Sequence, residues 1–208
     1  MYRQVKTTPR KRPRQDRSKA TVDAILAATA QVLISKGFDG LTTNAVAEAA
    51  GCSIGSLYQY FPNKEALVAA LIEHHLDIKS ARTVAELTRV AALPAHHAVR
   101  AMIVMTMEGY RDEPELKRVL IEQVPRVGRM AKIAALHSGT LQTVTALLRA
   151  RQKEMRIGNP DMAAFILMSA IEAICQRAAL FEPQRLRDPA LIDEATAMAV
   201  RYLGLPED

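Results

Sequence analysis

The segment Gly51-Cys52-Ser53-Ile54-Gly55-Ser56-Leu57-Tyr58-Gln59-Tyr60-Phe61-Pro62-Asn63-Lys64-Glu65-Ala66-Leu67 decides the fold expected for this 208-residue chain. Gly51 and Pro62 end helices, whereas Ser53 and Asn63 are residue types that cap helix N-termini. The segment therefore predicts a turn, a short capped helix, a second turn and the start of a longer helix. Small and hydroxyl-bearing residues on the short helix favour close approach by another molecule.

Two further helices are expected just before this segment. Apolar spacing predicts a first helix from about Ser18 to Gly37, where a left-handed residue would end it. A short helix over 44–50, capped by Thr42 or Thr43, follows. Two short helices joined around a glycine form the helix-turn-helix pattern. Residues 18–62 are thus predicted to form a three-helix unit.

The rest of the chain is also predicted to be helical, which makes the fold class all-α. Glycine and proline are sparse, and no strand-like alternation is present. The expected organisation is a flexible arm over 1–17, the helix-turn-helix domain over 18–62, and a helical ligand-binding and dimerisation domain over 63–208. Its helices are expected over 64–80, 96–111, 114–124, 128–156, 161–180 and 189–203.

Positive charge is concentrated at the N-terminus. The net charge is +6, yet residues 1–19 hold eight lysines and arginines against one aspartate. The arm is either a solvated tail or a segment that binds phosphates or the minor groove. Its position before the helix-turn-helix favours DNA contacts, through Arg10, Lys11, Arg12 and Arg14.

Several other functions lack a sequence signal. The two cysteines are far apart, which fits a reducing compartment, and the charged N-terminus has no apolar leader. Adjacent histidine pairs give poor metal geometry, and no nucleophile elbow or phosphate loop is present. We therefore expect a cytoplasmic protein without catalytic residues, metal or cofactor. The most apolar run, 162–175, is too short to span a membrane.

The two last helices predict self-association. Residues 162–174 are apolar around most of their helix, so this helix requires cover on all sides. A second copy of the chain is the expected cover, and the final helix adds a stripe from Leu191 to Tyr202. The alternative is a core formed within one chain.

Taken together, residues 18–72 resemble the tetracycline-repressor (TetR) family of bacterial regulators. The resemblance rests on Gly37-Phe38, Leu41-Thr42-Thr43, the run 46–51, the run 53–61 and Lys64-Glu65-Ala66-Leu67. It implies an all-α homodimer whose third helices enter the major groove of a palindromic operator. It also implies a C-terminal domain that binds a small-molecule effector and, on binding, releases double-stranded DNA.

Candidate DNA contacts follow from the residue types and this resemblance. Phosphates need hydroxyls, helix N-termini and cations, which are offered by Thr42, Thr43, Ser53, Tyr58, Tyr60 and Lys64. Ordinary capping and core packing explain some of these equally well. Base reading is assigned to Asn44, Ile54, Ser56 and Gln59. Gly55 permits close approach, whereas Ile54 is either a base contact or a core residue.

The effector is not identified by the sequence. Methionines suit an adaptable apolar pocket, and polar residues nearby could add contacts. The candidates are Arg100, Met102, Met105, Glu108, Met130 and His137. The leading hypothesis is a ligand-responsive repressor, although activation is not separated from repression. The alternatives are a nonspecific architectural DNA binder and an enzyme or small-molecule carrier.

Overall fold

The computed structural model describes residues 7–8, 16–112, 114–123 and 125–206. Over these residues the chain is helical and contains no strand, as the all-α prediction required. It divides into two compact units: Met1–Asp77 with Glu115–Lys132, and Ile78–Pro114 with Ile133–Asp208. The second half of α4 and the start of α7 therefore belong to a different unit from the rest of their helices.

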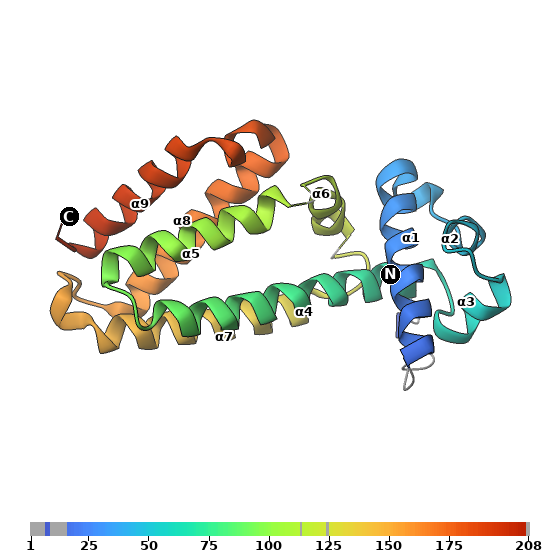
Figure 1. Ribbon diagram of the computed structural model, residues 1–208, viewed down its shortest axis with the longest axis horizontal. Coiled ribbons are helices and arrows are strands. Elements are labelled where there is room, and N and C mark those ends of the chain that lie inside the picture. The colour runs from blue at the N-terminus through green and yellow to red at the C-terminus, as the bar shows by residue number, and fades with distance from the viewer. Residues whose placement is uncertain (1–6, 9–15, 113, 124, 207–208) are drawn as a thin grey trace. The chain divides into compact units, whose positions relative to one another are not determined.

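The first unit is built on three N-terminal helices: α1 (Asp16–Gly40), α2 (Thr43–Ala49) and α3 (Ile54–Tyr60). Consecutive helices pack on each other (Figure 1). The first half of α4 (Lys64–Val90) and most of α6 (Pro114–Gln123) belong to the same unit. The core of this unit consists of buried apolar side chains, including Ile25, Leu33, Leu41, Val46, Leu57, Phe61 and Leu67. Burial of each such side chain stabilises the fold by about 1.5–3 kcal/mol.

Gly37 ends the regular part of α1, as predicted. Its backbone has φ 67° and ψ 179°, a conformation that essentially only glycine adopts. Phe38 and Leu41 follow, and Leu41 is fully buried. The chain thus turns at Gly37 and packs its next apolar residues into the core.

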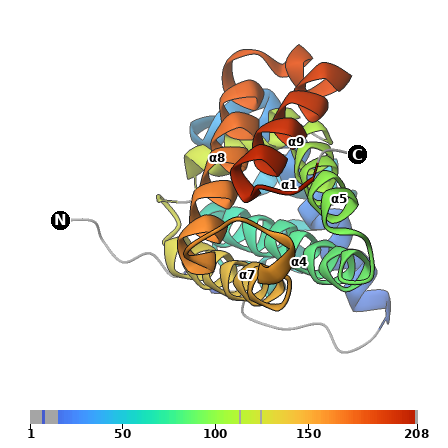
Figure 2. The ribbon, with the colours of Figure 1, turned by 90° about the vertical axis from the view of Figure 1, so that its left-hand side faces the viewer.

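The second unit contains five helical segments: the end of α4, α5 (Ala95–Arg111), α7 (Met130–Ala150, from Ile133), α8 (Pro160–Phe181) and α9 (Pro189–Leu203). Short 3₁₀ helices η1 (Gln152–Glu154) and η2 (Pro183–Arg187) precede α8 and α9. α5 packs against both α8 and α9, and Figure 2 shows α9 beside α5. One core cluster joins Ala95, Leu148, Ala164, Val200 and Leu203.

Two predicted helix ends were wrong. α4 continues to Val90 instead of stopping near Ser80, because its residues 80–90 include no glycine or proline. α7 ends at Ala150, and η1 replaces the rest of the helix expected to reach residue 156.

Gly204 caps α9 in the left-handed conformation, with φ 64°.

α8 is longer than its most apolar run suggested. It has 22 residues and a mean hydropathy of 1.5 over its most apolar 18-residue window, so its length and composition match a membrane-spanning helix. Core helices pass the same test, and Ala163, Ala164, Ile171 and Cys175 are buried within this chain. Other α8 side chains, Met162, Phe165 and Ile166, are 53%, 55% and 40% exposed. The described residues of one chain therefore cover α8 on one side only.

Candidate nucleic-acid interface

The short helices of the first unit are capped by hydroxyl side chains. Thr42 Oγ1 accepts a hydrogen bond from the Ala45 amide at 3.1 Å, and Ser53 Oγ accepts one from the Ser56 amide at 3.0 Å. Each cap satisfies one amide of a helix N-terminus and contributes about 1 kcal/mol. Thr42, and not Thr43, is therefore the cap of α2. Both caps are exposed, so they also lie where a phosphate could reach them.

α3 has a buried face and an exposed face. Leu57 and Phe61 are 0% and 2% exposed, whereas Ile54 and Tyr58 are 38% and 40% exposed. Ile54 therefore lies at the surface, which disfavours the alternative that it is a core residue. Gln59 and Gly55 are exposed as well. The outer face of α3 thus presents an apolar side chain, a phenol, an amide and a glycine.

Gly55 has no internal packing reason to be a glycine. An added Cβ would meet only Ser53 Oγ within 4 Å, at 3.9 Å. Glycine is nevertheless unfavourable in a helix, by about 1 kcal/mol relative to alanine. Close approach by another molecule would explain why a glycine stands at this position.

Tyr58 joins α3 to α2. Its hydroxyl lies 3.1 Å from Oγ1 of Thr43, within hydrogen-bonding distance. The two candidate phosphate ligands are therefore brought together on the surface. Tyr60 is half-buried, with its ring centroid 6.5 Å from that of Phe61. Asn44, also exposed, lies next to Thr43 on α2.

Lys64 has a role within the protein that the sequence did not show. Its Nζ donates to the Phe38 carbonyl at 3.0 Å and lies 4.6 Å from the centre of the Phe38 ring. It thereby ties the start of α4 to the last residues of α1, which follow the bend at Gly37. An ammonium has three donors, so this contact is compatible with a phosphate contact.

The four basic candidates of the arm, Arg10, Lys11, Arg12 and Arg14, lie outside the described residues. Thr7 is described and contacts Arg129, whose Nη1 and Nη2 donate to Thr7 Oγ1 at 3.2 Å and to the Thr7 carbonyl at 3.1 Å. Arg129 also forms an ion pair with Glu73 of α4, with Nε 2.6 Å from Oε1. Thr7, which precedes the basic candidates in the sequence, is thus held by a residue of the first unit.

The candidate effector residues are not brought together as a single group. Arg100 is exposed and pairs with Asp193, with Nη2 2.9 Å from Oδ1. Met102, Met105 and Glu108 are half-buried on α5. His137 is exposed on α7. Met130 is 56% exposed and belongs to the first unit.

A polar cluster in the second unit was missed. The Tyr110 hydroxyl donates to Glu172 Oε1 at 2.8 Å, and Lys79 Nζ donates to the same oxygen at 3.1 Å. Burial alone would raise the pKa of Glu172, but Lys79, the Tyr110 hydrogen bond and His137 hold it below its usual value. Burial and the nearby Glu172 charge raise the pKa of Tyr110 far above its usual value. The sequence feature that could have indicated this cluster is Glu172, a single carboxylate within the apolar run 162–175.

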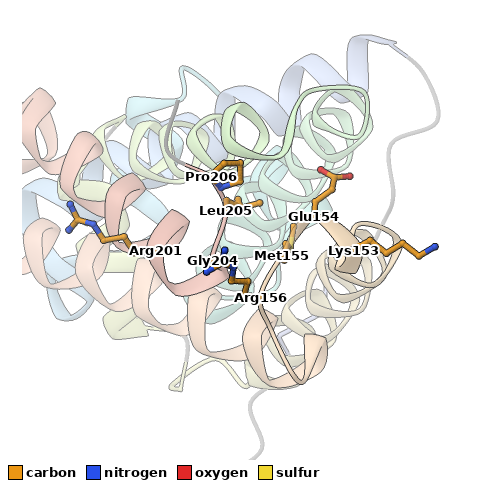
Figure 3. A pocket seen from close by; sticks show the side chains of 8 residues that line it. All are labelled: Lys153, Glu154, Met155, Arg156, Arg201, Gly204, Leu205 and Pro206. Carbon is orange, nitrogen blue, oxygen red and sulfur yellow. The ribbon is translucent and has the colours of Figure 1, made fainter.

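A pocket of about 450 Å³ lies where η1 meets the C-terminal end of α9. Its lining includes Lys153, Arg156 and Arg201, and none of the candidate effector residues. Lys153 and Arg201 extend away from it in opposite directions (Figure 3). These two cationic groups therefore do not converge on a single point, so the arrangement is not one that would bind an anion.

Large apolar side chains are exposed on both α8 and α9. The largest are Met162, Phe165, Ile166 and Phe181 on α8, and Met198 and Tyr202 on α9. Monomeric proteins rarely leave large apolar patches in water. This surface is therefore a candidate interface.

Comparison with known proteins gives two family matches. Residues 25–71 match the family described as bacterial regulatory proteins, tetR family, and residues 94–203 match the tetracyclin repressor-like C-terminal domain. The Escherichia coli K12 regulator RutR is 36% identical over 96 residues, or 46% of this chain and 44% of RutR. The chain thus spans less than half of that relative's length.

Solved structures share the fold. A regulator from Mesorhizobium loti that is ascribed to the TetR family has a TM-score of 0.74 at 20% identity, covering 91% of this chain and 98% of its own. SmeT, the repressor of the Stenotrophomonas maltophilia multidrug efflux pump SmeDEF, has a TM-score of 0.64 at 22% identity, covering 88% and 90%. The C-terminal match alone spans more than half of the sequence. The chain therefore belongs to the tetR family of bacterial regulatory proteins.

Proposed function

We propose that the protein is a homodimeric transcriptional repressor that binds a palindromic operator and releases it when a small molecule binds. The observation that carries the proposal is the exposed outer face of α3, with Ile54, Gly55, Tyr58 and Gln59 beside the capped N-terminus of α2. We place the protein in the cytoplasm, where bacterial DNA is found, and assign it no catalytic activity.

DNA contacts would divide into two groups. Phosphates would be bound by the hydroxyl and cationic residues Thr42, Thr43, Ser53, Tyr58, Tyr60 and Lys64, together with the basic arm. Bases would be read by Asn44, Ile54, Ser56 and Gln59, since amides pair with adenine and an apolar side chain meets the thymine methyl group. Gly55 would let the backbone approach the groove wall.

Two observations support a ligand-responsive dimer. The exposed apolar residues of α8 and α9 offer a surface that a second copy would cover. SmeT, whose fold is similar, has been crystallised with triclosan. We propose that residues 18–62 form the DNA-binding domain and 63–208 the effector and dimerisation domain, with Arg100, Met102, Met105, Glu108, Met130 and His137 as candidate effector contacts.

The test is selection of DNA from a randomised pool, followed by footprinting of the selected sequence. We expect two inverted half-sites about one helical turn apart. Selection without a defined footprint would indicate an architectural DNA binder instead. In fluorescence anisotropy, Tyr60→Ala with Lys64→Ala should weaken binding to the selected site. Unchanged affinity would favour an enzyme or carrier with an incidental helix-turn-helix.

A further inference from the structure

Lys79 occupies a site with the composition of an ammonium-binding site. Its Nζ lies 3.1 Å from Oε1 of Glu172 and 5.9 Å from the ring centre of Tyr110. A carboxylate together with an aromatic ring is a combination by which proteins bind organic ammonium ions. In this chain, α8 and α5 provide the carboxylate and the ring, and α4 provides the ammonium.

The three partners differ in how easily they could leave. Tyr110 is 9% exposed and the Glu172 side chain 28% exposed, and the two are hydrogen-bonded at 2.8 Å. The Lys79 side chain is 53% exposed at the end of a flexible four-carbon stem. Lys79 can therefore move into water at a small cost, since partly exposed ion pairs contribute only about 0–1 kcal/mol. Glu172 and Tyr110 remain in place.

Charge then selects the class of molecule that can replace Lys79. An organic cation would keep the Glu172 carboxylate paired. An anion would bring a second negative charge to it, and a neutral molecule would leave a half-buried carboxylate without a counter-ion. His137, on α7, adds only a weak positive influence on Glu172.

We propose that Glu172 and Tyr110 form the head-group site for an organic ammonium effector, which binds by displacing Lys79. This inference rests on the proposed function, because it identifies the chemical class of the effector. Lys79 lies on α4, the helix that begins at Lys64, so displacement breaks an ion pair between α4 and α8. Effector binding would thereby release α4 from one of its attachments.

Chemical rescue tests the site in the full-length protein. Lys79→Ala empties the site, and n-butylammonium replaces the missing side chain. We expect isothermal titration calorimetry to give a Kd up to about sixfold lower for Lys79→Ala than for the wild type, because an ion pair of at most about 1 kcal/mol leaves the site open for about one sixth of the time. n-Butylammonium should also raise the Tm of Lys79→Ala, whereas 1-butanol and butyrate should not.

The controls separate this site from general amine binding. Lys79→Ala with Glu172→Gln should lose the preference for the cation. Arg82→Ala removes a surface ion pair on the same helix, Arg82 with Asp112 at 3.5 Å, and should gain no affinity. Equal shifts with 1-butanol, or an undiminished preference in the double variant, would overturn the proposal. Should Lys79→Ala fail to fold, Lys79→Met retains the apolar stem and the same criteria apply.

Operator binding by the wild type, measured at saturating n-butylammonium, distinguishes the two proposals. Specific ammonium binding with unchanged DNA affinity would support the binding site, overturn its role as the effector site, and leave repression by another ligand unaffected. DNA release by other molecules, without ammonium preference at Glu172, would leave the repressor proposal intact and overturn this one.

Discussion

Packing within the chain does not explain why residue 55 is a glycine. An added Cβ would make only an ordinary contact with Ser53 Oγ, at 3.9 Å, and alanine would favour the helix. We expect Gly55→Ala to raise the free energy of unfolding by up to about 1 kcal/mol in urea denaturation. The same change should weaken operator binding about tenfold or more in anisotropy, a loss of about 1.4 kcal/mol, because the new methyl group meets the DNA.

Gly139 supplies the matched control for that prediction. It lies within α7, and an added Cβ there would meet nothing within 4 Å. Gly139→Ala should therefore stabilise the protein and leave DNA affinity unchanged. Stabilisation of Gly55→Ala with full DNA affinity would exclude close approach at α3.

The two cysteines should differ in reactivity. Cys175 is fully buried, and burial, with the nearby charge of Glu172, raises the pKa of its thiol to about 11. Cys52 is partly exposed in the turn between α2 and α3. We expect Ellman's reagent to label one thiol per chain in native buffer and two in denaturant. Cys52→Ser should abolish the native reaction, and a persistent reaction would show that the second unit opens.

At the scale of elements, the basic arm has a measurable electrostatic role. Each phosphate contact contributes about 0.9 to the slope of log affinity against log salt. Deletion of residues 1–15 should therefore weaken operator binding and flatten this slope. Deletion of residues 1–8 removes the Thr7–Arg129 contact but keeps Arg10, Lys11, Arg12 and Arg14, so its slope should stay near that of the wild type. An unchanged slope in the longer deletion would remove the arm from the mechanism.

Helix starts were predictable and helix ends less so. Asn63 caps α4 with a hydrogen bond from the Ala66 amide at 2.8 Å, and Asn159 and Asp188 cap α8 and α9. A cap is a local interaction between residues two or three apart, so the sequence displays it directly. The absence of glycine and proline permits α4 to extend to Val90, and burial of Leu87 and Val90 stabilises the extension, which the local sequence does not reveal.

At the scale of the whole molecule, dimerisation should depend on the exposed face of α8. Phe165 is 55% exposed, and aspartate at its position would place a charge within the proposed interface. We expect Phe165→Asp to shift analytical ultracentrifugation from dimer to folded monomer at micromolar concentration. Binding to a two-half-site operator should fall by at least about tenfold, because the two reading heads are no longer linked.

Val84→Asp provides the comparison, since Val84 is 61% exposed on α4. It adds the same charge at an exposed apolar position outside α8 and α9 and should leave the dimer intact. A dimeric Phe165→Asp variant with unchanged circular dichroism would contradict the proposed interface.

The sequence by itself determined the helical class, the helix-turn-helix and its caps, because periodicity, capping and turn residues act over a few positions. Tertiary structure alone decided that Ile54 is exposed and that Lys64 binds the Phe38 carbonyl. It also decided that Glu172 meets Tyr110 and Lys79, which are 62 and 93 positions away in the sequence. Such contacts depend on how distant helices pack, and no local pattern encodes which polar side chain will face which.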